Sequence, residues 1–205
     1  GGRYYDPLST LGFLAARTSR IRLTTYVLVL GYSHPLEICK RYGTLDRLSG
    51  GRVVLGLGVG SLKPEFELLG LGGDEFEQRG ARGDDALRAI RAGFAQRLPE
   101  YHGPHYDYEG FIIDPCGVQA HLPFWIGGRS RRSLRRAVEL GEGWMPFGLG
   151  HDELAAMIAW ARQLPAWAAR DKPIDLVLRN EKRIDPMAEP DEAAEVLRVE
   201  RAGLG

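Results

Sequence analysis

The sequence has no long apolar run, no excess of charge of either sign and only two cysteines. No apolar stretch reaches the roughly 18 residues that a membrane span requires, and the amino terminus has no basic segment followed by an apolar one. The 27 basic residues balance the 27 acidic ones, so nothing in the composition attracts nucleic acid in bulk. We therefore expect a cytoplasmic protein without membrane or nucleic-acid partners.

The motifs of several common enzyme classes are missing as well. Cys39 and Cys116 match no metal-binding or redox spacing, so free thiols are expected. The five histidines form no recognised metal motif, so surface or helix-capping roles are expected and no metal site is predicted. No P-loop, Ser-His-Asp or Cys-His pattern is recognisable, so no catalytic residue is identified.

What the sequence does contain is a regular alternation of strand and helix signals. Five short apolar runs, each followed by a helical pattern, predict a parallel sheet. The strands are expected at Ile21–Leu30, Val53–Val59, Phe124–Ile126, Trp144–Phe147 and Ile174–Leu178. The helices are expected at Pro7–Thr18, Pro35–Ser49, Asp84–Leu98, Ser130–Leu140, Asp152–Arg170 and Pro190–Ala202, with a hairpin at His105–Ile113 around Glu109-Gly110.

The turn residues at the strand ends favour a barrel over a doubly wound sheet. The predicted strands end in Gly31, in Gly58 and Gly60, in Gly127-Gly128, in Gly148 and in Asn180. Loops with exposed backbone thus gather at one end of the sheet, as in a (β/α)8 TIM barrel, whereas a doubly wound sheet concentrates them at one switch point. We predict a single α/β barrel domain over residues 1–205, with an insertion at about 62–122.

The glycine-rich exit of the second predicted strand raises the alternative of a dinucleotide loop. Thr44–Ser61 combines a helix end, a Gly-Gly break, a β-branched strand and three alternating glycines. The fingerprint GxGxxG would need glycine where the chain has Ser61 or Lys63, so it does not fit. The glycines either form a tight strand exit or let a flat group approach the backbone.

A second glycine pair points to an anion. Gly127-Gly128-Arg129-Ser130 leads from a predicted strand directly into a helix N-terminus, whose free N–H groups and dipole favour a phosphate. Arg129 adds a guanidinium group that can bind phosphate through two hydrogen bonds. The arginines at 131, 132, 135 and 136 mostly face away from the apolar stripe of this helix and are expected on its solvent side.

Four segments stand in an order that is typical of one enzyme family. They are DPLSTLGFLAARTSRIRLTTYVLVL, HPLEICKRYGTLDRLSGGRVVLGLGVGSLKPEF, PFWIGGRSRRSLRRAVELGEGW and PDEAAEVLRVERAGLG. The chain resembles the luciferase-like flavin and deazaflavin oxidoreductases over nearly its whole length, and these segments are the most specific parts of the resemblance. The resemblance implies a (β/α)8 barrel and is nearest to the branch that uses coenzyme F420 in place of FMN.

The resemblance also implies roles for particular residues. Relatives carry a non-proline cis peptide against the cofactor ring, which by resemblance falls at Tyr26-Val27. The other expected cofactor contacts are Gly58, Val59, Gly60 and Ser61 along the ring and Gly127, Gly128, Arg129 and Ser130 at the phosphate. Relatives that oxidise a sugar phosphate carry glutamate in place of Ser61, which speaks against that activity. Candidate substrate contacts are His34, Trp144 and Arg179.

The implied function is an oxidoreductase whose cofactor carries the chemistry. F420 accepts or donates hydride at a ring carbon, while the barrel supplies a dry pocket and orients a small organic substrate. Two alternatives stay open: an FMN-dependent monooxygenase, and a flavin-binding barrel without catalysis. The resemblance alone implies a homodimer.

Counted against the family's eight strands, the five predicted strands correspond to the third to the seventh. Five parallel strands would leave open apolar edges and an unfilled barrel interior, which a stable protein avoids. We therefore expect the native chain to be longer at both ends, or partner segments to close the barrel. Mass spectrometry tests this expectation, because a mass near 22.7 kDa for a stable protein that binds its cofactor alone would contradict it.

Overall fold

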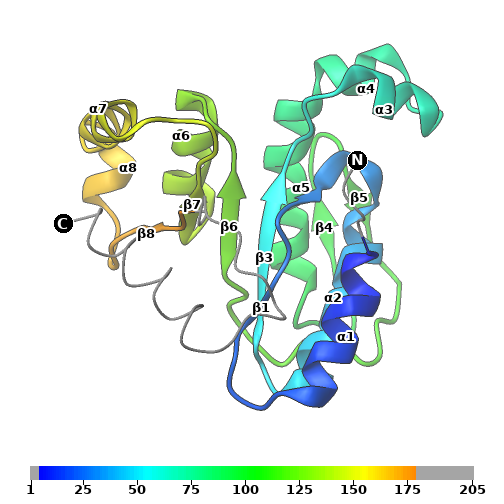
Figure 1. Ribbon diagram of the computed structural model, residues 1–205. Helices are drawn as coiled ribbons and strands as arrows, with labels where there is room; N and C mark the ends of the chain where they lie inside the picture. The colour runs from blue at the N-terminus through cyan, green and yellow to red at the C-terminus, as the bar shows by residue number, and fades with distance from the viewer. Residues whose placement is uncertain (1–4, 179–205) are drawn as a thin grey trace.

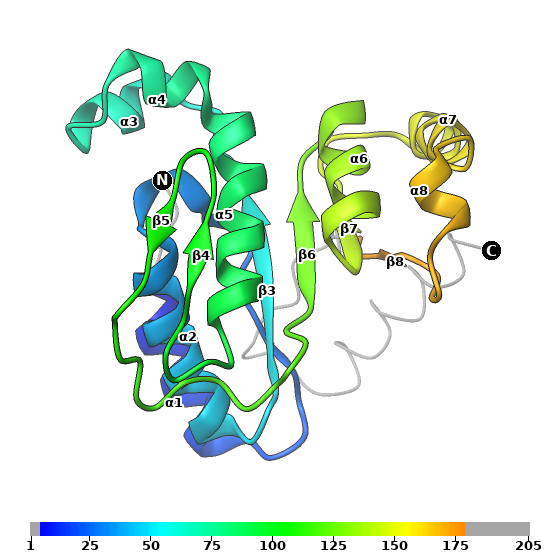
Figure 2. The same ribbon diagram turned by 180° about the vertical axis from the view of Figure 1, so that it is seen from behind.

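A computed structural model describes residues 5–178, which form a parallel sheet with helices beside it (Figures 1 and 2). The strands of the sheet are β1 (Leu23–Thr24), β2 (Leu28–Val29), β3 (Val53–Gly58), β6 (Phe124–Gly127), β7 (Gly143–Met145) and β8 (Asp175–Leu176). The helices are α1 (Pro7–Arg17), α2 (Pro35–Ser49), α3 (Lys63–Leu68), α4 (Gly73–Glu77), α5 (Arg79–Gly93), α6 (Arg131–Leu140), α7 (His151–Ala161) and α8 (Pro165–Ala168). A 3-10 turn covers Leu30–Tyr32, and β4 (Tyr101–His102) and β5 (Asp107–Tyr108) form a separate antiparallel hairpin.

The order of the strands in the sheet is their order in the chain. β1 and β2 both pair with β3, and β6, β7 and β8 follow in turn, all parallel. A doubly wound sheet reverses its strand order at a switch point, and the described residues show no reversal. The sheet is therefore an arc of a barrel, which confirms the predicted α/β barrel class. Within residues 5–178 this arc is open, since β1 and β8 each pair on one side only.

Local sequence signals place the first two helices where they were predicted. The Asp6 carboxylate accepts a hydrogen bond from the N–H of Ser9 at 2.8 Å, and Pro7 occupies the first helical position of α1. α2 begins at Pro35 and ends at Ser49, and the positive φ of 69° at its C-cap, Gly50, favours glycine. No helix in the described part of the chain combines the length and the apolar character needed to cross a membrane.

Two of the other predicted helices have different bounds. α5 begins at Arg79 and ends at Gly93, where Asp84–Leu98 was predicted, because Gly80 and Gly83 hide the helical pattern of its first turns. The helix predicted at Asp152–Arg170 divides into α7 and α8, since Pro165 cannot continue a helix and instead opens the next one. The predicted helix Pro190–Ala202 lies outside the described residues.

The hairpin was predicted around Glu109-Gly110, and this was wrong. Tyr101 pairs with Tyr108 and His102 with Asp107, so the chain reverses between residues 102 and 107. The buried carboxylate of Asp85 holds this turn, accepting from the N–H of His105 at 2.8 Å and of Tyr106 at 3.1 Å. A contact between residues 20 positions apart is invisible to a local turn signal.

The main core lies between the sheet and the helices. Phe124 and Ile126 of β6 are fully buried on this side, and so are Leu55 and Leu57 of β3. Trp144 of β7 pairs in register with Ile126 and is likewise fully buried. Side chains alternate along a strand, so the residues between these positions face the opposite, concave side of the arc.

Buried charged groups tie the connecting loops to this core. Asp46 of α2 is fully buried, and its carboxylate accepts from the N–H of Val118 at 2.8 Å and from the N–H and side-chain amide of Gln119 at 3.0 and 2.7 Å. Arg136 was expected on the solvent side of α6, and this was wrong. Its guanidinium pairs with Asp84 and donates to the carbonyl of Gly80 at 3.0 Å, and both of these residues lie in α5. The buried Arg136 side chain therefore links α6 to α5.

We predict that Asp46→Asn lowers the free energy of unfolding by about 3 kcal/mol, because an amide nitrogen would then face at least one buried N–H donor. Urea unfolding followed by circular dichroism measures the change. The matched control is Asp171→Asn, at an exposed turn position, which should change the value by no more than about 0.5 kcal/mol. Equal stabilities for the two variants would contradict the role given to Asp46.

Candidate functional site

The loops that follow the parallel strands gather at one end of the sheet, the upper end in Figure 1. β3 and β6 both point toward this end, and α3 and α4 lie beside it (Figure 1). Barrel enzymes bind their ligands at the carboxyl ends of the strands. This end of the arc is therefore the candidate functional site.

The first strand reaches the site through a bulge. Thr24 pairs with Val54 and Leu28 with Leu57, so four steps along this strand match three along β3 and one residue is extra. The predicted continuous strand Ile21–Leu30 is thus interrupted, and β1 and β2 are its two pieces. The bulge contains a cis peptide bond between Tyr26 and Val27, at the position implied by the resemblance. Tyr26 turns outward and is 53% exposed.

The glycines around the bulge are in contact with protein groups. A Cβ atom at Gly56 would lie 1.9 Å from the carbonyl oxygen of Thr25, whose hydroxyl donates to the Gly56 carbonyl at 2.7 Å. A Cβ at Gly58 or at Gly127 would lie 2.9 or 2.8 Å from the methyl groups of Val27. Val27 therefore fills the space above Gly58 and Gly127, which was expected to receive a flat ligand. A ring placed there would contact Val27 and not the glycines.

The next three predicted contact residues point in different directions. Val59 packs toward α5, since a Cβ on Gly83 would lie 2.5 Å from its methyl group. Gly60 has a φ of 82° and lies against the ring of Phe66. Ser61 is exposed. Of this group, Ser61 presents a side chain to solvent at the end of β3.

The predicted anion segment is built as a helix N-terminus. The hydroxyl of Ser130 accepts from the N–H of Ser133, and the hydroxyl of Ser133 accepts from the N–H of Ser130, both at 3.2 Å. The first two residues of α6, Arg131 and Arg132, have N–H groups without an acceptor inside the helix. The Gly128 N–H donates to the Met145 carbonyl at 3.2 Å, which holds the exits of β6 and β7 together.

Arg129 stands beside this helix end. Its guanidinium carbon lies 5.9 Å from the ring centre of Phe147, in the loop after β7. Phe147 is 49% exposed, so an aromatic surface and a cation adjoin the free amides. The sequence reasoning missed Phe147, which it treated as the last residue of a strand.

The concave face carries further side chains that the sequence reasoning did not select. Gly56, Trp125, Gly143 and Asp175 occupy one row across four strands. The Trp125 indole lies over Gly143, where a Cβ would be 2.3 Å away, and its N–H donates to Asp175 at 3.2 Å. Period-two alternation could have found Trp125, because both of its neighbours are core residues.

The three predicted substrate contacts have different environments. His34 caps α2, accepting through Nδ1 from the N–H of Leu36 at 3.2 Å, and its ring lies edge-on to Tyr106 at 5.4 Å between centres. Burial lowers the pKa of His34, against the weaker opposing effect of Glu37. Trp144 lies in the core on the helix side, with its indole N–H lacking a hydrogen-bond partner among the described residues. Arg179 lies outside the described residues.

Comparison with known proteins gives a consistent picture. A family model described as luciferase-like monooxygenase matches residues 1–197. An uncharacterized protein of Mycobacterium bovis is 33% identical over 80% of this chain and 55% of its own length. A protein of Microbacterium testaceum named F420-dependent glucose-6-phosphate dehydrogenase is 33% identical over 71% of this chain and 43% of its own length.

The fold has a solved counterpart. The crystal structure of the monooxygenase RslO1 from Streptomyces bottropensis superposes with a TM-score of 0.71 and 25% identity, over 86% of this chain and 56% of that one. The chain thus spans about half the length of the relatives that it matches.

We predict that Gly56→Ala disrupts the bulge, since its methyl group would overlap the Thr25 carbonyl, and lowers the free energy of unfolding by about 3 kcal/mol. Gly12→Ala is the matched control: Gly12 lies in α1 with no heavy atom within 4 Å of the added methyl group. Helix propensity should make that variant more stable by up to about 1 kcal/mol. Chemical unfolding of both variants measures the difference, and a stable Gly56→Ala would show that the bulge can move away.

Proposed function

Because this chain belongs to the luciferase-like monooxygenase family, we propose that the protein is an oxidoreductase that uses coenzyme F420 for hydride transfer to or from a small organic substrate. The observation that carries the proposal is the grouping of Arg129, the free amides of α6 and the exposed ring of Phe147 at the carboxyl ends of β6 and β7. This grouping offers one place for a phosphate next to one for an aromatic ring.

The donor set fits the phosphate of such a cofactor. Arg129 is exposed, so its guanidinium is free to reach an anion. The N–H groups of Arg131 and Arg132 stand at the positive end of α6. The Ser130–Ser133 cap holds that helix end in place, so the site needs little reorganisation to accept an oxyanion.

The surface beside it suits a flat ring. Tyr26 and Val27 form the bulge between β1 and β2, with Val27 seated over Gly58 and Gly127. In our proposal Val27 and Tyr26 would contact the ring, next to the exposed ring of Phe147. Ser61 offers a hydroxyl that can donate or accept a hydrogen bond but cannot act as a general base at neutral pH.

Bound F420 would supply hydride transfer at a ring carbon. The chain's own residues would bind and orient it: Arg129 would hold the phosphate, and the Tyr26–Val27 bulge would lie against the ring. Burial lowers the pKa of His34, which favours the neutral form of its imidazole. Its Nδ1 is already occupied by the Leu36 N–H, which leaves Nε2 for a ligand.

The choice of F420 rests on the relatives. A relative that matches 71% of this chain is named for F420 dependence, and a second relative of similar coverage is named a putative F420-dependent oxidoreductase. Glucose 6-phosphate is not our proposed substrate, because the family resemblance implies a glutamate in sugar-phosphate-oxidising members at the position of Ser61. A flavin-dependent monooxygenase is the second candidate, favoured by the similarity to RslO1.

Fluorescence titration of the purified protein with F420 and with FMN tests the proposal. We expect tight, saturable binding of F420. Tight binding of FMN alone would favour the monooxygenase, and binding of neither would contradict both.

Arg129→Gln should weaken cofactor binding at least about tenfold through loss of a charged hydrogen bond, whereas Arg135→Gln, at an exposed position on the same helix, should leave the affinity unchanged. Equal affinities of the two variants would refute the phosphate site.

The homodimer, the cytoplasmic location and the domain insertion at about 62–122 stay predictions. Residues 59–123, which join β3 to β6, contain α3, α4, α5 and the β4–β5 hairpin.

A further inference from the structure

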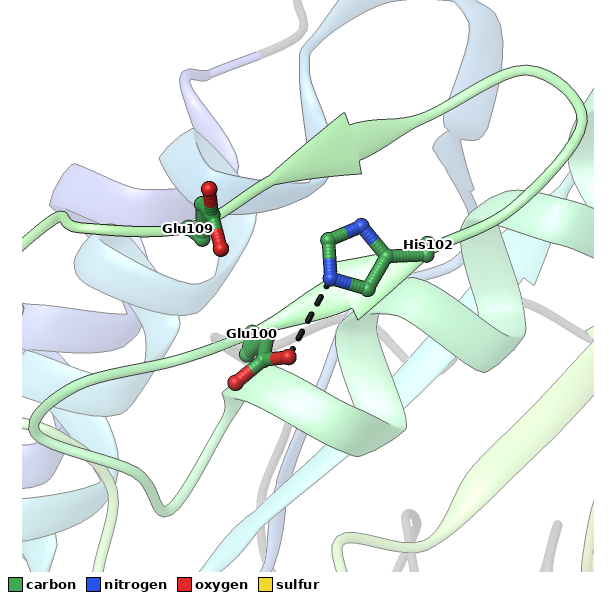
Figure 3. A group of neighbouring side chains, drawn as sticks. All are labelled: Glu100, His102 and Glu109. Carbon is green, nitrogen blue, oxygen red and sulfur yellow. Dashed lines mark hydrogen bonds and ion pairs between the residues drawn. The ribbon is translucent and has the colours of Figure 1, made fainter.

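The outer face of the β4–β5 hairpin concentrates metal-binding side chains. Glu100 and His102 project from one strand and Glu109 from the other, toward one another (Figure 3). Their ligand atoms all lie within 4.8 Å of each other, and all three residues are exposed. Asp107, opposite His102, completes the group. We propose that Glu100, His102 and Glu109 bind a divalent cation of the zinc class.

The register of the hairpin explains why these residues share one face. Tyr101 pairs with Tyr108 and His102 with Asp107, so Glu100 stands opposite Glu109. Like charges directly opposite each other destabilise an antiparallel pair. Among residues 5–178, none of the carboxylates of Glu100, Asp107 and Glu109 pairs with a lysine or arginine. His102 contacts Glu100 and Asp107, whereas Glu109 has no ion pair among the described residues. A bound cation would therefore neutralise the Glu109 carboxylate that faces Glu100.

The imidazole is oriented for coordination. Nδ1 of His102 lies 2.7 Å from a carboxylate oxygen of Asp107, and Nε2 lies 3.1 Å from an oxygen of Glu100. The Asp107 carboxylate can hold a proton on Nδ1, as is common at zinc sites. A metal ion would then replace the proton shared between Nε2 and Glu100, with both of these groups as its ligands. Two ligand atoms on one tetrahedral zinc ion are about 3.4 Å apart, so His102 and Glu100 are already near the spacing that the ion requires.

The reverse face of the hairpin gives the ligands a rigid support. The Tyr108 hydroxyl donates to the Ala89 carbonyl at 2.6 Å, and the Tyr101 hydroxyl donates to Asp85 at 2.5 Å, both partners in α5. Asp85 also holds the turn between the strands through two backbone N–H groups. The ligands thus project from a backbone that is fixed on its other side.

The ligand set selects the kind of metal. One imidazole nitrogen with carboxylate oxygens suits zinc and its neighbours in the first transition row, whereas calcium and magnesium prefer oxygen ligands alone. Three protein ligands leave a position for water. Because the site lies on the hairpin's outer face, we assign it a structural role, clamping β4 to β5 across the Glu100–Glu109 pair.

Isothermal titration calorimetry of the purified protein with zinc chloride tests the proposal. We expect one saturable site that excess Mg²⁺ or Ca²⁺ does not empty. His102→Gln and Glu109→Gln should weaken binding by more than about tenfold, and Asp107→Asn, which removes the group that orients the ring, by about tenfold. His105→Gln is the control, in the same hairpin but outside the ligand group, and should bind zinc like the unmodified protein.

Two further measurements separate loss of the ligand from loss of the fold. Without metal, Glu109→Gln should unfold at the same temperature as the unmodified protein or higher, because it removes a repulsion. Zinc should raise the unfolding temperature of the unmodified protein but not that of His102→Gln. Zinc binding that survives His102→Gln, or that magnesium abolishes, would show only a general attraction of cations to carboxylates and would overturn the proposal, as would an absence of binding.

Discussion

The contact between the Thr25–Val27 bulge and the glycines of β3 and β6 determines the shape of the candidate site. The Thr25 carbonyl occupies the space that a side chain at Gly56 would need, and Val27 occupies the space above Gly58 and Gly127. β3 pairs with β1, β2 and β6, so it connects the first two strands to the rest of the sheet. The alternating glycines are therefore a packing requirement first. They let the bulge fit against the sheet, and the bulge in turn presents Tyr26 to solvent.

Carboxylates that accept backbone N–H groups hold the long segment between β3 and β6. Asp46 fixes residues 118–119, Asp85 fixes the turn at residues 105–106, and Glu142 accepts from the N–H of Phe124 at 2.6 Å. Such bonds are costly to break, because each would leave a poorly solvated charge or donor unpaired. They explain how a connection of low regularity keeps a defined path along α2 and α5.

The sequence predicted those features that arise within a few residues. The caps at Asp6-Pro7 and Gly50 and the helix after Gly127-Gly128 all depend on neighbours in the chain. Features that depend on contacts distant in sequence were missed or misplaced. The burial of Arg136 requires Asp84 and Gly80 from another helix. The Glu100–His102–Glu109 group exists because the turn lies between residues 102 and 107, where no local signal placed it.

The hairpin connects this group to the candidate site through aromatic rings. His34, which follows the exit of β2 and caps α2, lies edge-on to Tyr106 and to Tyr108, with ring centres 5.4 and 6.2 Å apart. Tyr108 is anchored to α5 through its hydroxyl, while its strand neighbours Asp107 and Glu109 face outward. The segment around β5 thus contacts His34 on one face and carries one proposed metal ligand, Glu109, on the other. Because side chains alternate along it, a change in the pairing of this hairpin would move both faces together.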